Sequence, residues 1–301
     1  MPLTSDSLID RRRLKRHLIL WRGAAVFAVL GLLIALVGEK GELRRSDQLA
    51  RITINGVIAG DLDREKSLYD LPQDESTKAL IVHIDSPGGT VVGGESLYHA
   101  LRYVSEHMPV VIVMDEIATS AGYMTAIAGD RIFAREGTLT GSIGVIWQTT
   151  NVKGLLEKFG IQTDAIKSGK MKAEPSPFEP MTQEVREETE KLVLNIFDMF
   201  IAMVVERRRI TPSEVNKIAD GRVFTGLKAM EINLVDEIGG EREAIAWLES
   251  EKSIEADLPI HDFKIKREEQ IWEPFLSSMF GKTMFSERVR LDGLISLWHA
   301  E

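Results

Sequence analysis

The stretch ALIVHIDSPGG (79–89) decides the fold class, because a continuous apolar run stops abruptly at a proline and two glycines. An unbroken apolar run of this length is typical of a strand buried on both faces of a parallel sheet. A second such run, PVVIVMD (109–115), follows a segment with helical periodicity (91–107). Strands that alternate with helices predict a largely parallel sheet with helical crossovers. The predicted fold class is therefore α/β.

The same alternation continues on both sides of these runs. The acidic residues 59–77 are predicted to form a loop. The pattern indicates one folded domain (49–252) and leaves a C-terminal extension (253–301), which either packs on that domain or contacts a membrane or a neighbouring subunit. Further strands are predicted over residues 50–58, 130–134, 140–146, 161–167 and 258–265, and further helices over residues 120–129, 153–159, 183–208, 212–219, 225–231 and 240–251.

Composition excludes several classes of function. The chain has 301 residues, of which 44% are hydrophobic, and its net charge of −9 is opposite to the basic surface of a nucleic-acid-binding protein. It contains no cysteine, which excludes a cysteine nucleophile, thiolate metal ligands and disulfides. The glycine motifs that bind nucleotide phosphates are also missing. No cofactor is expected.

The N-terminus predicts a membrane anchor. The basic stretch RRRLKR (11–16) precedes LILWRGAAVFAVLGLLIALV (18–37), which is long enough to cross a bilayer as a helix. The alternatives are a buried globular helix and a cleaved signal peptide, but the run is apolar on every face and no good cleavage site follows it. The excess of basic residues before the span predicts a cytoplasmic tail (1–17). The chain beyond the linker (38–48) is then extracytoplasmic.

A serine follows the second buried run in ATSAGYMTA (118–126). Ser120 stands at the start of a predicted helix, where a serine is ordinarily a cap. Adjacent parallel strands bring the loops at their carboxyl ends together, so Gly88–Gly89 and Ser120–Ala121 are expected to face one cleft. A serine beside backbone N–H groups is also the arrangement of a nucleophile next to an oxyanion hole. The residues alone are compatible with both roles, cap and nucleophile.

A nucleophilic serine needs a base. None of the six histidines lies between residues 108 and 260, and His83, which precedes the glycine turn, is a weak candidate, so a Ser-His-Asp triad is not expected. A lysine can act as the base if a desolvated site lowers the pKa of its amine, so that the amine is neutral. Lys167, Lys170 and Lys172 lie among Ser, Gly, Pro and Phe residues that indicate an ordered turn. A solvated surface cluster is the alternative.

Five motifs, in order, resemble those of the bacterial signal peptide peptidase A family. This family consists of membrane-anchored peptidases with a Ser-Lys dyad, and its β-α-β superhelix is shared with Clp protease and crotonase. The chain is most similar to the short, single-domain form. The motifs are HIDSPGG (83–89), ATSAGY (118–123), TGSIGV (140–145), IKSGKMKAEPSPFEPMT (166–182) and ADGRVFTGLKAMEINLVDEIGG (219–240).

The resemblance implies a role for each candidate residue. Ser120 would be the nucleophile, at the first turn of a helix whose N-terminus also favours the anionic intermediate. Lys172 would be the general base, and Ser142 would hydrogen-bond the lysine amine and orient it. The backbone N–H groups of Gly89 and Ala121 would form the oxyanion hole.

The resemblance also implies a location, a substrate class and an assembly. Its members degrade cleaved signal peptides and other hydrophobic peptides at the extracytoplasmic face of the bacterial inner membrane. They form rings, commonly octameric, in which serine and lysine come from neighbouring chains. Lys167 and Lys170 are then expected to be dispensable. Two alternatives use the same fold: a crotonase-type acyl-CoA enzyme and a catalytically silent membrane scaffold.

Overall fold

The computed structural model describes residues 20–30, 46–265 and 295–297. The chain divides into two units, residues 1–46 and 47–301, and the second unit contains the sheet. In the first unit residues 20–30 are helical. Within the described ranges, no helix is both long enough and apolar enough to cross a bilayer. The predicted tail (1–17) and the rest of the predicted span (18–37) lie outside the described residues.

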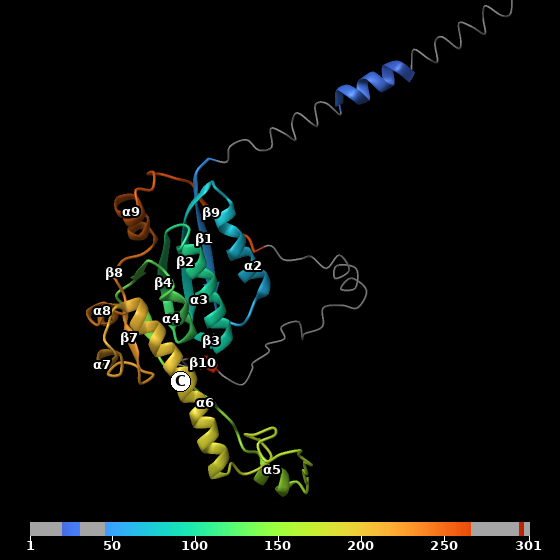
Figure 1. Cartoon of the computed structure of the whole chain (residues 1–301), viewed down its shortest axis with the longest axis vertical. Helices are drawn as coiled ribbons and strands as arrows, with labels where there is room; N and C mark the ends of the chain where they lie inside the picture. The colour runs from blue at the N-terminus through green and yellow to red at the C-terminus, as the bar shows by residue number, and fades with distance from the viewer. Residues whose placement is uncertain (1–19, 31–45, 266–294, 298–301) are drawn as a thin grey trace, which may run out of the picture. The chain divides into compact units, whose positions relative to one another are not determined.

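A largely parallel sheet of eight strands forms the centre of the second unit, counted over the described part of the chain (Figure 1). Its order is β7-β6-β4-β2-β1-β9, with β5 beside β4 and β8 beside β5. All pairs are parallel except β6 with β7. The strands are β1 (Gln48–Asn55), β2 (Thr77–Ser86), β4 (Val110–Thr119), β5 (Arg131–Ala134), β6 (Leu139–Gly141), β7 (Val223–Thr225), β8 (Glu237–Ile238) and β9 (Ile260–Asp262). The predicted α/β class is confirmed.

A second, two-stranded sheet lies beyond the end of β2. Strand β3 (Gly88–Thr90) pairs in antiparallel fashion with β10 (Ile295–Leu297), which comes from the C-terminal region. On its other edge, β3 forms a parallel bridge between Gly89 and Ile58. The short strand β3 is therefore paired along both edges.

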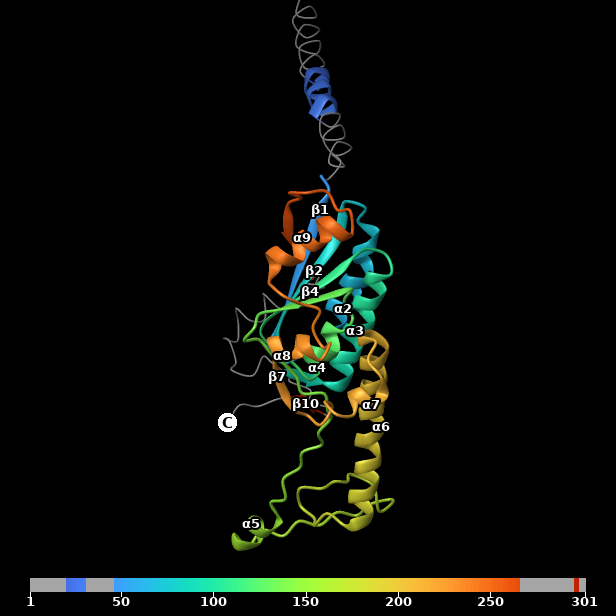
Figure 2. The same ribbon diagram turned by 90° about the vertical axis from the view of Figure 1, so that its left-hand side faces the viewer.

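Helices cover both faces of the main sheet (Figure 2). The main core joins one face to α2, α3, α4 and the C-terminal half of α6, whereas a smaller core joins the opposite face to α9. Alternate residues of β2 belong to the two cores: Leu80 and Val82 lie in the main core, and Ala79 and Ile81 lie in the smaller core. The helices are α2 (Leu62–Asp70), α3 (Val91–Ser105), α4 (Ala121–Ala126), α5 (Lys153–Lys158), α6 (Gln183–Arg208), α7 (Pro212–Val215), α8 (Gly226–Glu231) and α9 (Glu241–Glu251).

Three predicted elements differ clearly from the structure, and the helix predicted over 212–219 ends at Val215. Residues 161–167 form no strand, because an alternating pattern makes a strand only where another strand pairs with it. The predicted loop over 59–77 contains α2, which Asp61 caps by accepting a hydrogen bond from the Arg64 N–H at 3.0 Å. The strand predicted over 140–146 ends at Gly141, because the next residue takes a positive φ.

Candidate active site

The turns after β2 and β4 lie against each other. The hydroxyl of Thr119, at the end of β4, donates a hydrogen bond to the carbonyl oxygen of Pro87 at 2.9 Å. The hydroxyl oxygen of Ser86 accepts a bond from the Gly88 N–H at 3.1 Å, which shapes the glycine turn. The structure therefore brings Gly88–Gly89 and Ser120–Ala121 together, as expected for neighbouring parallel strands.

Ser120 forms a strained turn between β4 and α4. Its backbone has φ 57° and ψ −119°, a conformation that residues with a side chain rarely adopt and that clusters at functional sites. Two bonds of 2.9 Å hold it: the Ser120 N–H donates to the Gly141 carbonyl, and the Met124 N–H donates to the Ser120 carbonyl. The Ser120 hydroxyl makes no capping bond to α4. A capping role therefore does not explain this serine, whereas a sharp strand-to-helix turn is typical of a nucleophile.

Gly89 lies where only a glycine fits. The Ile58 N–H donates to the Gly88 carbonyl and the Thr90 N–H donates to the Ile58 carbonyl, both at 2.8 Å. A Cβ on Gly89 would lie 1.8 Å from the Ile58 carbonyl oxygen. Because successive backbone groups of a strand point to opposite edges, the N–H of Gly89 points away from Ile58. It faces the edge on which Ser296 of β10 pairs with Gly89.

Ala121 and Ser142 adjoin the same turn. Ala121 is the first residue of α4 and is fully buried. Ser142 follows Gly141, whose carbonyl accepts the Ser120 N–H, and it is itself buried with φ 50°. The Ser142 N–H donates to the carbonyl of Arg222 at 2.8 Å. Four of the five predicted site residues therefore surround one turn.

Lys172 lies on a different part of the chain. It belongs to the segment between β6 and α6, which we call the lysine arm (146–181). The arm's helix α5 and the residues that follow it lie well away from α4 in both views (Figures 1 and 2). The Lys172 side chain is exposed, and its backbone N–H donates to the Gly169 carbonyl at 3.1 Å. A single chain thus does not bring Lys172 to Ser120.

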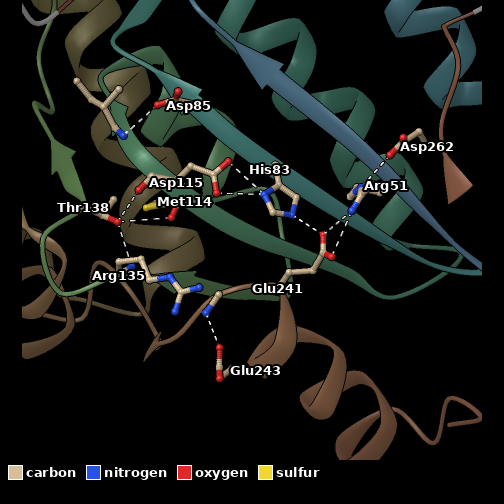
Figure 3. Close-up of polar contacts among 12 residues, drawn as sticks. Arg51, His83, Asp85, Met114, Asp115, Arg135, Thr138, Glu241, Glu243 and Asp262 are labelled. Atoms are coloured by element: carbon tan, nitrogen blue, oxygen red, sulfur yellow. Dashed lines mark hydrogen bonds and ion pairs between the residues drawn. The ribbon is translucent and has the colours of Figure 1, made fainter. Parts of the chain in front are cut away.

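His83 belongs to a polar network on the opposite face of the sheet (Figure 3). Its Nδ1 lies 3.1 Å from Asp115 and its Nε2 lies 2.7 Å from Glu241. Arg51 donates a hydrogen bond to Glu241 at 3.3 Å and another to Asp262 at 2.8 Å. The hydrogen bond from Arg51 lowers the pKa of Asp262. The network ties β1, β2, β4 and β9 to α9, so His83 is a structural contact on the face away from α4. It borders a cavity of about 450 Å³ lined by Arg51, Thr53, His83, Asp115, Asp262 and Phe263.

Comparison with known proteins identifies the family. The model of peptidase family S49 matches residues 102–255, about half of the chain. A protein from Synechocystis with a provisional protease name is 37% identical over 212 residues, which cover 70% of this chain and 76% of that protein. A protein from Enterococcus faecium, provisionally named signal peptide peptidase SppA, is 30% identical over 231 residues, which cover 72% of this chain and 67% of that protein.

Among solved structures, a variant of ClpP1 from Listeria monocytogenes has a TM-score of 0.43 and 18% identity, and covers 64% of this chain and 92% of its own. The family model and the relatives cover the turns after β4 and β6 and the lysine arm. This chain belongs to peptidase family S49, a family of serine peptidases.

Proposed function

We propose that this protein is a membrane-anchored serine endopeptidase that degrades hydrophobic peptides, including cleaved signal peptides, outside the cytoplasm. One observation carries the catalytic part: the strained turn at Ser120 lies against the Gly88–Gly89 turn, to which Thr119 is bonded. The apolar run 18–37 supports the anchor. The name of the Enterococcus faecium relative supports the substrate class.

In the proposed reaction the Ser120 hydroxyl oxygen attacks the scissile carbonyl carbon. Its proton passes to the neutral amine of Lys172, which the Ser142 hydroxyl orients. The oxyanion forms between the N–H groups of Gly89 and Ala121. Lys172 then protonates the leaving amine, and a water molecule repeats the sequence to release the acyl group from Ser120.

The edge of β3 that pairs with β10 supports a peptide as substrate. Residues 295–297 of the chain already pair with this edge as an antiparallel strand. Peptides commonly bind proteins by adding a strand to an exposed edge, where backbone hydrogen bonds give affinity. A peptide on this edge would present a carbonyl oxygen to the N–H of Gly89.

The proposed dyad needs a second copy of the chain, because Ser120 and Lys172 lie on separate parts of one chain. The lysine arm exposes a series of large apolar side chains, and exposed apolar side chains that are concentrated on one segment favour an interaction surface. A neighbouring copy that covers the arm would bring its own Ser120 to Lys172, and repetition of this contact would close a ring. The exposed side chains are Ile146, Leu155, Phe159, Ile161, Ile166, Met171 and Phe178.

The test combines active-site labelling with turnover of a Leu-containing fluorogenic peptide by detergent-solubilised protein. A fluorophosphonate probe is expected to label the wild type and not Ser120→Ala. Lys172→Arg should assemble normally without turnover, because arginine keeps its charge at any usable pH. A probe that labels Ser120→Ala equally well, or full turnover by Lys172→Arg, would refute the mechanism. An acyl-CoA enzyme would instead bind coenzyme A and tolerate both changes.

A further inference from the structure

Lys167 is held differently from the neighbouring Lys170. Its Nζ lies 2.7 Å from Oε1 of Glu174 and 2.9 Å from Oε2 of Glu179. The side chains of Lys167 and Glu174 are only 16% and 7% exposed, on an arm where most side chains face solvent. Lys170 is 85% exposed and approaches Glu184 only to 3.8 Å. Lys167 is therefore built into the arm, and Lys170 lies on its surface.

The ion pair between Lys167 and Glu174 closes the loop that carries Lys172. The two partners stand at the ends of the loop, and Lys172 lies between them. Within the loop the Lys172 N–H donates to the Gly169 carbonyl at 3.1 Å, and Ala173 takes a left-handed φ of 62°. A loop that is closed at its ends and turned in the middle holds the backbone of Lys172 in one place.

The second carboxylate, Glu179, fixes this loop to the rest of the arm. Its carbonyl accepts a bond from the side-chain amide of Asn151 at 2.6 Å. Nearby, the Val152 N–H donates to the Pro177 carbonyl at 2.8 Å. Lys167 thus connects the loop with Lys172 to the residues directly before α5.

The positive charge of Lys167 makes this residue unsuited to be the general base. Hydrogen bonds to Glu174 and Glu179 raise the pKa of Lys167, and the bond from Lys167 lowers the pKa of Glu174. Both groups therefore keep their charges at neutral pH. A general base must be neutral before it accepts a proton, so Lys167 is unsuited to deprotonate Ser120.

We propose that Lys167, Glu174 and Glu179 position the general base, because their ion pairs fix the loop that presents Lys172 to Ser120. This inference rests on the proposed Ser120–Lys172 mechanism. A displacement of about 1 Å at a catalytic group can lower a rate by about 100-fold, so a loosened loop would reduce kcat without any loss of substrate contacts. Lys167 is then a positioning residue, and this proposal replaces the expectation from the sequence that it is dispensable.

The first test compares Lys167→Ala with Lys167→Arg, and uses Lys170→Ala as the matched control. We expect Lys167→Ala to lower kcat about 10- to 100-fold with KM changed less than about twofold. Arginine can still bridge two carboxylates, so Lys167→Arg should recover most of the loss. Lys170→Ala should match the wild type. A wild-type kcat for Lys167→Ala, a loss confined to KM, or no recovery by arginine would overturn the proposal.

Mixed assemblies provide the second test. It separates a positioning role from a general folding defect, because a misfolded variant would not restore activity in a mixture. Lys167→Ala should behave as Lys172→Arg does: each restores activity when mixed with Ser120→Ala, and neither restores it when they are mixed with each other. Different behaviour of the two arm variants overturns the positioning role. A fully active Lys167→Ala beside an inactive Lys172→Arg would refute only this inference, whereas an active Lys172→Arg would refute the proposed function itself.

Discussion

The backbone of Ser120 has a cost that a glycine would avoid. At φ 57° and ψ −119° the side chain crowds its own backbone, and such residues cost about 1–3 kcal/mol. We expect Ser120→Gly to be more stable than Ser120→Ala by about 1 kcal/mol in free energy of unfolding, although neither variant turns over peptide. Urea unfolding of the two proteins measures the difference. A glycine variant that is no more stable would show that the turn is unstrained.

Gly89 allows a direct test of the oxyanion hole. An added methyl group would collide with the Ile58 carbonyl, so Gly89→Ala must displace the N–H that is proposed to bind the oxyanion. We expect kcat to fall about 100- to 1000-fold, the usual loss of one oxyanion-hole donor. Gly60→Ala is the control, because no atom of a residue other than its chain neighbours lies within 4 Å of its added methyl group. Equal kcat for the two variants would remove Gly89 from the site.

At the scale of single residues, the sequence locates the candidates but not their geometry. Ser120 and Gly89 are recognisable because each follows a continuous apolar strand. Asn233, between α8 and β8, has φ 62°, a left-handed backbone conformation that asparagine tolerates. The bond from Thr119 to Pro87 and the ion pairs of Lys167 leave no pattern in the sequence, because both depend on how a turn folds.

At the scale of elements, the prediction succeeds where the apolar pattern is long. The helix predicted over 91–107 is α3 and that predicted over 183–208 is α6, within a few residues. The prediction of a strand is correct where a neighbouring strand pairs with it, as for β2 and β4. The sequence predicts a loop where α2 lies, because the nine residues of this helix contribute few buried side chains and its cap, Asp61, lies in an acidic stretch.

The start of α9 gives a prediction about acid stability. The carboxylate of Glu243 accepts a hydrogen bond from the Gly240 N–H at 2.8 Å, and this bond together with Arg242 lowers the pKa of Glu243 to about 2. Its pKa in the unfolded chain is about 4.3, so the bond stabilises the fold fully above about pH 5. That contribution is lost as the pH falls toward about 2.

We therefore expect Glu243→Gln to have a lower unfolding midpoint than the wild type at pH 7. The difference should shrink as the pH falls and vanish near pH 2, in a series of urea titrations. Glu251→Gln, at the other end of α9, serves as the control and should follow the wild type throughout. A midpoint difference that is the same at every pH would contradict the role assigned to the carboxylate.

Strand β10 gives a prediction about substrate affinity. It pairs with the edge of β3 that a peptide is proposed to use, so it must leave before a peptide binds there. Truncation after Leu294 should therefore lower KM about 2- to 10-fold and leave kcat unchanged, because the fraction of molecules with an open edge rises. Truncation after Leu297 keeps the strand and is the matched control. Equal KM values for the two truncations would show that β10 and substrate do not compete.

At the scale of the whole molecule, Ser120 and Lys172 of the proposed dyad lie apart in the single chain. The strands and turns around Ser120 were predictable because they pack within one chain. The position of the lysine arm was not, because its apolar side chains face solvent in the single chain and its predicted strand (161–167) has no partner in the described structure. The missing contacts are those that a neighbouring copy is proposed to supply.

Phe159 and Ile166 test whether the arm is that interface. They are 74% and 102% exposed, and burial of one such side chain contributes about 1.5–3 kcal/mol. Replacing both with serine should weaken association by at least about 100-fold, measured by sedimentation, and turnover should fall in parallel. The unfolding midpoint should stay constant, because neither side chain belongs to the core.

Leu62 offers the matched control for this change, since it is 81% exposed but lies on α2, outside the arm. Leu62→Ser should leave assembly and turnover unchanged. If the double variant becomes monomeric and yet cleaves peptide at the wild-type rate, Ser120 and Lys172 must meet within one chain. If it stays fully assembled, copies associate through another surface. Only a joint loss of assembly and turnover agrees with an active site completed by a neighbouring arm.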